Sequence, residues 1–209
     1  MKQRNISGAT LFNPRIYHQS YLNRATLQCD SRWERDYLID CEFDKTITRF
    51  VTQPISFTYE YDEKIRRFTS DILLQRIGGT FEHIEIKDYR YADCQTLRNK
   101  ISHISRLLEK HQNSSLTLVT SKDIYDDPSH ITRKILYKYM FVIVPDELTK
   151  MAISALYKSE MLIEDLEHRF IQKGGEKTDV WAFLAQHYSS IVFHGKPNLS
   201  STNIINWSK

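Results

Sequence analysis

The stretch Ile65–Lys87, which reads IRRFTSDILLQRIGGTFEHIEIK, decides the fold of this chain. Two β-rich runs flank the pair Gly78-Gly79, and this pattern predicts a β-hairpin. Alternate residues of a strand share one face, so Glu85 and Lys87 are expected to project to the same side. Pairing across the hairpin would bring Asp71 to the same end. The sequence therefore predicts that two carboxylates and one ammonium group meet in a small volume.

Oxygen-rich clusters of this kind are typical of Mg²⁺ sites, and phosphodiester hydrolysis uses them. A third acid, Glu34, lies on the helix expected before the hairpin and is a candidate third ligand. The alternative is structural: Asp71 caps a turn, Glu85 and Lys87 form an exposed ion pair of little energetic consequence, and Glu34 only caps its helix. Asp71 opens an apolar run, where an unpaired buried carboxylate is costly, and this favours the metal site.

Composition limits the class of protein. A chain of 209 residues with 41% hydrophobic and 26% charged residues can bury one core, or one core and a smaller one, as soluble globular proteins do. It contains no apolar run long enough to cross a bilayer and no apolar signal region. Cys29, Cys41 and Cys94 lack metal-ligand spacing and predict a reduced, intracellular chain. The net charge of +3 is too small to indicate nucleic-acid binding by itself.

The order of sequence patterns predicts three segments. Residues 1–28 carry little periodicity and are expected to form an N-terminal arm. Residues 29–125 are expected to form an α/β domain with a mixed sheet. A helix begins at Ser31, which forms a capping box with Glu34, strands follow from Thr46, and the apolar spacing of residues 95–111 predicts a crossover helix before a strand at 116–120.

Residues 126–209 are expected to form a separate helical domain. Helices are predicted from Pro128, Pro145, Met161 and Thr178, and two short strands at 191–193 and 204–205 follow them. Helices followed by a small hairpin suggest a winged-helix-like module. Such a module would contact a partner protein or DNA.

Four motifs in order carry a resemblance to a known family. They are SRWERDYL at 31–38, Gln53-Pro54, FTSDIL at 68–73 and IEIK at 84–87. Together they resemble TnsA, the endonuclease subunit of heteromeric, Tn-seven-like transposases, over residues 30–120. The chain departs from the family pattern at two positions: Ser70 stands where the family usually has Pro, and Glu85 stands where some members have Gln.

The resemblance implies a restriction-endonuclease-like core and a metal-dependent mechanism. Glu34, Asp71 and Glu85 would hold one or two Mg²⁺ ions, for which Mn²⁺ can substitute, and the Ile86 carbonyl would be a possible extra ligand. Lys87 would orient the attacking water or stabilise the charge that builds on the scissile phosphate. Catalytic roles are therefore expected for the three acids and the lysine.

The resemblance also implies partners: double-stranded DNA at transposon ends, a TnsB-like transposase that cuts and joins the 3′ ends, and a TnsC-like ATPase regulator. The chain itself would cut the 5′ strands, in the bacterial cytoplasm at the nucleoid. Arg98, Lys100 and Arg106 on the expected crossover helix either contact phosphates or keep that helix soluble. His83 is expected to support the site by packing. The alternatives are a non-catalytic adapter that recruits the transposase or its regulator, and a stand-alone restriction or junction nuclease.

Overall fold

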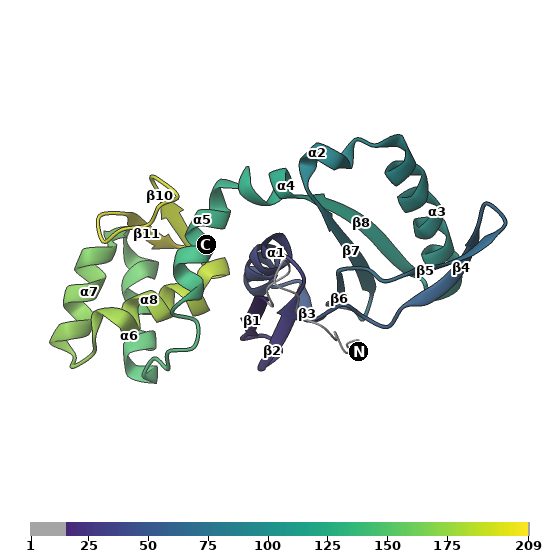
Figure 1. The fold of residues 1–209 in the computed structure, drawn as a ribbon. Coiled ribbons are helices and arrows are strands. Elements are labelled where there is room, and N and C mark those ends of the chain that lie inside the picture. The colour runs from purple at the N-terminus through teal and green to yellow at the C-terminus, as the bar shows by residue number, and fades with distance from the viewer. Residues whose placement is uncertain (1–15, 209) are drawn as a thin grey trace. The chain divides into compact units, whose positions relative to one another are not determined.

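The computed structural model describes residues 16–208 and divides the chain into two compact units, Met1–Asp126 and Asp127–Lys209. We call them the N-terminal unit and the C-terminal unit (Figure 1). Helices and a mixed sheet make up the N-terminal unit, so the predicted α/β class is confirmed. No helix within residues 16–208 is long and apolar enough to cross a membrane.

A four-stranded sheet forms the centre of the N-terminal unit, in the order β3-β6-β7-β8. Its strands are β3 (Ile47–Thr52), β6 (Ile72–Arg76), β7 (Phe81–Lys87) and β8 (Ser114–Thr120). The β6–β7 hairpin turns at Gly78 and Gly79, whose φ angles of 88° and 80° favour glycine. Strands β7 and β8 are parallel, and a parallel pair needs a crossover, which contains α3 (Gln95–Gln112). The predicted hairpin and crossover helix are both present.

One face of the sheet packs against α1 (Arg32–Phe43) and the hairpin of β1 (Ile16–Ser20) and β2 (Ala25–Cys29). The sheet supplies alternate apolar residues to this core: Ile72, Leu74, Ile84 and Ile86. Residues 16–28 belong to the segment expected as an arm, whereas here they pair as strands and bury Leu27. Residues 1–15 lie outside the described part of the chain.

A second hairpin covers the opposite face together with α3. It consists of β4 (Phe57–Tyr61) and β5 (Lys64–Phe68), joined through Asp62 and Glu63, which both have positive φ as a tight hairpin turn requires. Its core is formed by Tyr59, Phe68, Ile104, Leu108 and Leu116. Two short helices, α2 (Tyr89–Ala92) and α4 (Ser121–Tyr125), begin close to the carboxyl ends of β7 and β8.

The C-terminal unit contains four longer helices and a three-stranded antiparallel sheet in the order β10-β11-β9. The helices are α5 (Pro128–Tyr137), α6 (Asp146–Lys158), α7 (Ile163–Gln172) and α8 (Lys177–Gln186); the strands are β9 (Met161–Leu162), β10 (Ile191–His194) and β11 (Ile204–Trp207). The helix expected from Met161 begins instead at Ile163, because Met161 and Leu162 pair with β11. Fully buried Phe170 and Phe183 lie in the core of this unit.

Candidate active site

The register of the β6–β7 hairpin places Asp71 beside the end of β7. Ile72 pairs with Ile84, and the Asp71 backbone N–H donates to the Ile84 carbonyl at 3.0 Å. The Ile86 N–H then donates to Asp71 Oδ2 at 2.6 Å. These bonds fix one oxygen of Asp71 against β7, between the positions of Glu85 and Lys87.

Lys87 connects the two carboxylates. Its Nζ lies 2.8 Å from Glu85 Oε1 and 3.9 Å from Asp71 Oδ2. The Glu85 side chain is 7% exposed, whereas that of Lys87 is 37% exposed, so the ammonium group also reaches solvent. The structure therefore brings together Asp71, Glu85 and Lys87, the three groups that the hairpin pattern places at one end.

Glu34 approaches this cluster from the first turn of α1. The Ser31 hydroxyl accepts from the Glu34 N–H at 3.1 Å, as the capping pattern predicts. The Glu34 carboxylate does not close the box on Ser31; its Oε2 accepts from the Asp30 N–H at 2.9 Å. The Glu34 side chain is buried, and its negative charge raises the pKa values of both Asp71 and Lys87. Glu34 is therefore within electrostatic reach of the cluster while it caps the chain before α1.

The acids repel one another in a poorly solvated place. Burial, and then repulsion by Glu85, raises the pKa of Asp71 to about 7, although Lys87 opposes this rise. Burial also raises the pKa of Glu34, against the hydrogen bond from Asp30. Burial alone would lower the pKa of Lys87, but Asp71 and Glu85 raise it above its usual value. The cluster therefore has more buried negative charge than its one ammonium group offsets.

The oxygens of this cluster fit a hard cation. Glu85 Oε2 is buried and has no hydrogen-bond partner among residues 16–208. Asp71 Oδ1 lies 3.5 Å from Gln53 Nε2, at the outer limit of a hydrogen bond. Unsatisfied carboxylate oxygens are the ligands that Mg²⁺ takes in proteins. Asp71 and Glu85 are therefore the residues of this edge best suited to hold a divalent ion.

The side chains are not arranged as a complete metal site. In the described part of the chain, no three His, Cys, Asp or Glu side chains form a group that could hold a metal ion. Two oxygens of the cluster already have partners: Lys87 Nζ lies 2.8 Å from Glu85 Oε1, and Glu34 Oε2 accepts from the Asp30 N–H. A cation that bound through these two oxygens would have to displace the ammonium group or turn the Glu34 carboxylate.

Gln53 is a residue of this site to which the sequence assigned no role. The Gln53 side chain is buried, and the Gln53 backbone N–H donates to the Asp71 backbone carbonyl at 2.8 Å. Its carboxamide also bonds to Glu34 and opposes the rise in the pKa of that acid. Gln53 has a φ of 45°. This left-handed conformation is unfavourable for a residue other than glycine, and the position before Pro54 favours an extended backbone instead. Strain of this kind concentrates at functional sites. The Gln-Pro pair between two strands was the one signal in the sequence.

His83 and Ser70 support the strand ends behind the acids. Ser70 Oγ and His83 Nδ1 lie 2.8 Å apart, and both side chains are buried. Burial lowers the pKa of His83, so the imidazole is neutral at pH 7. Ser70 is the position where the TnsA pattern usually has Pro, and here the serine is bonded to the neighbouring strand.

The three basic residues expected to touch DNA lie on α3, and they differ from one another. Arg98 is exposed and pairs with Asp93. Lys100 is half-buried, with its Nζ 5.5 Å from the ring centroid of Phe68, so it contributes to packing of the hairpin. Arg106 is exposed and donates to the Ser102 hydroxyl at 3.3 Å. Their contact with phosphates stays a prediction.

Comparison with known proteins adds no assignment. No protein-family model matches the chain, and no curated protein sequence matches it. Any function of the chain must therefore be inferred from its own side chains and from the motifs within residues 30–120.

Proposed function

We propose that the chain is a metal-dependent DNA endonuclease, the TnsA-type subunit that cuts the 5′ strands at transposon ends. A TnsB-like partner would cut and join the 3′ ends. The observation that carries the proposal is the meeting of Lys87 with two carboxylates: that of Asp71, which is partly buried, and that of Glu85, which is buried and has one unsatisfied oxygen. The mixed sheet is compatible with a restriction-endonuclease-like core. The C-terminal unit is compatible with a winged-helix-like module that would contact a TnsC-like regulator or DNA.

Each acid has one anchored oxygen, and this supports a role in holding a cation. Asp71 Oδ2 accepts from the Ile86 N–H, and Glu34 Oε2 accepts from the Asp30 N–H. Glu85 Oε1 is anchored by Lys87. One oxygen therefore fixes the orientation of each carboxylate, and Glu85 Oε2, which has no hydrogen-bond partner among the described residues, is the oxygen most available to a ligand at little further entropic cost.

Asp71 and Glu85, with Glu34 and the Ile86 carbonyl, would hold Mg²⁺, which polarises a phosphoryl oxygen and lowers the pKa of bound water. Lys87 has a different task. Its pKa is raised by Asp71 and Glu85 although burial opposes this, so it stays protonated at neutral pH and does not act as a base. Its ammonium group would stabilise the negative charge on the phosphoryl oxygens while the bond from water to phosphorus forms and the bond to the leaving oxygen breaks.

The test is cleavage of transposon-end DNA by the reconstituted transposase, with each strand scored separately. Asp71→Ala is expected to lose at least about 100-fold in 5′-strand cleavage, because the cluster loses a cation ligand, while 3′ cleavage persists. Glu109→Ala, which removes an exposed acid of the same unit, is the control and should cut both strands normally.

Normal 5′ cleavage by Asp71→Ala would refute the assignment and favour a non-catalytic adapter. A stand-alone nuclease makes a different prediction: the isolated chain would then cut specific DNA robustly without the partner subunits.

A further inference from the structure

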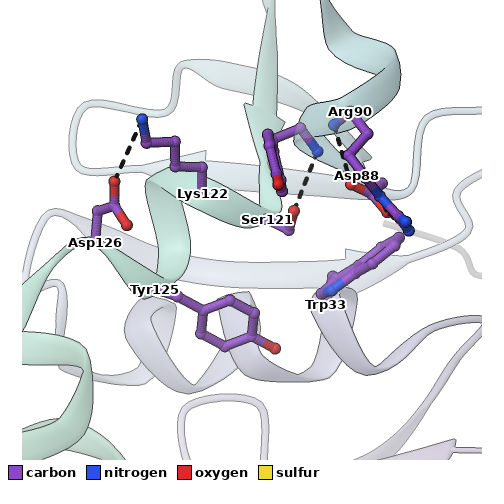
Figure 2. A pocket seen from close by; sticks show the side chains of 8 residues that line it. Trp33, Asp88, Arg90, Ser121, Lys122, Tyr125 and Asp126 are labelled. Carbon is purple, nitrogen blue, oxygen red and sulfur yellow. Dashed lines mark hydrogen bonds and ion pairs between the residues drawn. The ribbon is translucent and has the colours of Figure 1, made fainter.

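A cleft with a volume of about 620 Å³ lies beyond the ends of β7 and β8, within the N-terminal unit (Figure 2). Lys87 and Thr120 are paired in the parallel strands β7 and β8, so both strands end at one edge of the sheet. The cleft is lined by residues that follow these strands and by one residue of α1. They include Trp33, Tyr89, Arg90, Ser121, Lys122 and Tyr125. Crevices outside the carboxyl ends of strands are common ligand sites in α/β proteins.

Two residues that line the cleft directly adjoin candidate site residues in the chain. Trp33 directly precedes Glu34 on α1. On β7, Lys87 is followed at once by Asp88, which also lines the cleft. A strand of DNA whose phosphate lies at Lys87 would therefore have its neighbouring nucleotide within reach of the cleft.

Aromatic residues from three different elements line this cleft. Trp33 is half-buried and packs against the core, whereas Tyr89 and Tyr125 are 54% and 46% exposed. The Tyr125 hydroxyl donates to Asp36 Oδ2 at 2.9 Å, which holds α4 against α1. Figure 2 shows the side chains of Trp33 and Tyr125 approaching from α1 and α4. Exposed aromatic rings around a hollow can stack on bases, whatever the base.

Cationic groups accompany the rings. Lys122 Nζ lies 3.8 Å from Asp126 Oδ2, and both side chains are about two-thirds exposed, so this ion pair is weak and its exchange for a phosphate costs little. Figure 2 shows Lys122 on the side of the cleft away from Trp33. Arg90 is 64% exposed and pairs with Asp88. The rings of the cleft can stack on a base, and its exposed cations can contact a phosphate.

We propose that this cleft binds one unstacked nucleotide of the strand that is to be cut, next to the scissile phosphate. The base would stack on Trp33 and Tyr125, and its phosphate would contact Lys122. The volume lies within the range of about 300–1,000 Å³ that is usual for small-molecule sites. The position relative to the cut rests on the proposed nuclease function, but affinity for unpaired bases does not, because it can be measured without cleavage.

The experiment is fluorescence anisotropy of the full chain with a labelled ten-nucleotide oligothymidylate, in EDTA so that no cleavage occurs. The matched probe has the same length and charge but abasic sugars. We expect the thymidylate to bind at least about tenfold more tightly than the abasic strand, since stacking contributes about 1–3 kcal/mol per base. Lys122→Ala should weaken both probes equally.

Two aromatic variants test the cleft itself. Trp33→Ala and Tyr125→Ala should each lose about 5- to 100-fold in affinity for the thymidylate and leave abasic binding unchanged. Trp33→Phe, which keeps a ring, should retain most of the affinity. Tyr17→Ala removes a tyrosine of β1 that is 55% exposed, outside the cleft, and is the control.

Equal affinity for the two probes would overturn the proposal, as would unchanged thymidylate binding by Tyr125→Ala. This second variant keeps the test decisive if Trp33→Ala fails to fold, because Tyr125 is 46% exposed and lies outside the core of the unit. If the chain is not a nuclease, these affinities are still expected, because they are measured without cleavage. The experiment therefore distinguishes a cleft that does not bind bases from a chain that does not cut DNA.

Discussion

Two buried acids of the N-terminal unit differ in how their carboxylate oxygens are hydrogen-bonded. Glu42 on α1 is completely satisfied: its Oε1 lies 2.9 Å from His18 Nε2, and its Oε2 accepts from the Leu22 N–H at 2.8 Å. Glu85 shares its Oε1 with Lys87, while its Oε2 is buried without a partner among the described residues. Both carboxylates are nearly inaccessible, so the difference does not arise from exposure.

We infer that the difference separates an acid that stabilises the fold from acids that bind a ligand. Glu42 ties the β1–β2 hairpin to α1, and a buried network contributes most when every member is bonded. At the carboxylate cluster, Asp71 has a raised pKa and Gln53 has a left-handed backbone. Such groups cost stability, and proteins keep them where function requires them. We infer that the cluster is stabilised by a cation rather than by its own contacts.

The largest effect is expected at Glu42. Glu42→Ala should lower the free energy of unfolding by about 3–5 kcal/mol, because it removes the carboxylate that bonds the buried His18 ring and accepts from the Leu22 N–H. Urea denaturation in EDTA measures this change. Glu109→Ala, an exposed acid of α3, is the control. A loss below about 1 kcal/mol would remove the contrast between the two sites.

At Asp71 we expect a substitution to increase the stability of the metal-free chain, whereas at Glu42 it decreases stability. The pKa of about 7 that Asp71 has in the folded chain lies above the usual value of 3.8, so the folded state binds more protons than the unfolded state between these limits. Stability without metal should therefore fall as pH rises from about 4 to about 7. Asp71→Asn cannot ionise and should be more stable than the parent chain by about 1–3 kcal/mol at pH 8, and similar to it at pH 4.

Urea denaturation of both proteins across this pH range, again in EDTA, checks the prediction. A parent chain whose stability follows that of Asp71→Asn at every pH would mean that Asp71 is not destabilised by its surroundings.

The smallest effect is expected at Gln53. Both Gln53→Ala and Gln53→Gly remove the carboxamide, but only glycine relieves the φ of 45°. The glycine variant should therefore be the more stable of the two by about 1 kcal/mol in urea denaturation, the reverse of the usual order of these residues. If alanine is the more stable variant, Gln53 carries no backbone strain.

Local patterns were sufficient to predict much of this unit. The glycine pair and the alternating residues predicted the β6–β7 hairpin, and the period-2 rule placed Glu85 and Lys87 on one face. Pairing across this hairpin also predicted Asp71 at the same end, since hairpin register follows from the turn.

Contacts between residues far apart in the chain could not be predicted from the sequence. The hairpin of residues 16–29 depends on packing of Leu27 and on a bond from His18 to Glu42, 24 residues away. Met161 pairs with Ile205 and so leaves the helix that its own spacing favoured. The left-handed backbone of Gln53 depends in the same way on neighbours that propensity does not describe.

The central claim is that Asp71 and Glu85 form a divalent-cation site. Calorimetric titration of Mn²⁺ into the metal-free chain tests it most directly, with Glu85→Gln and Glu109→Gln as matched variants. We predict carboxylate-dependent heat, release of protons at pH 7 because Asp71 must ionise, and at least about tenfold weaker binding by Glu85→Gln alone. No heat with the parent chain, or equal affinity in Glu85→Gln, would contradict it.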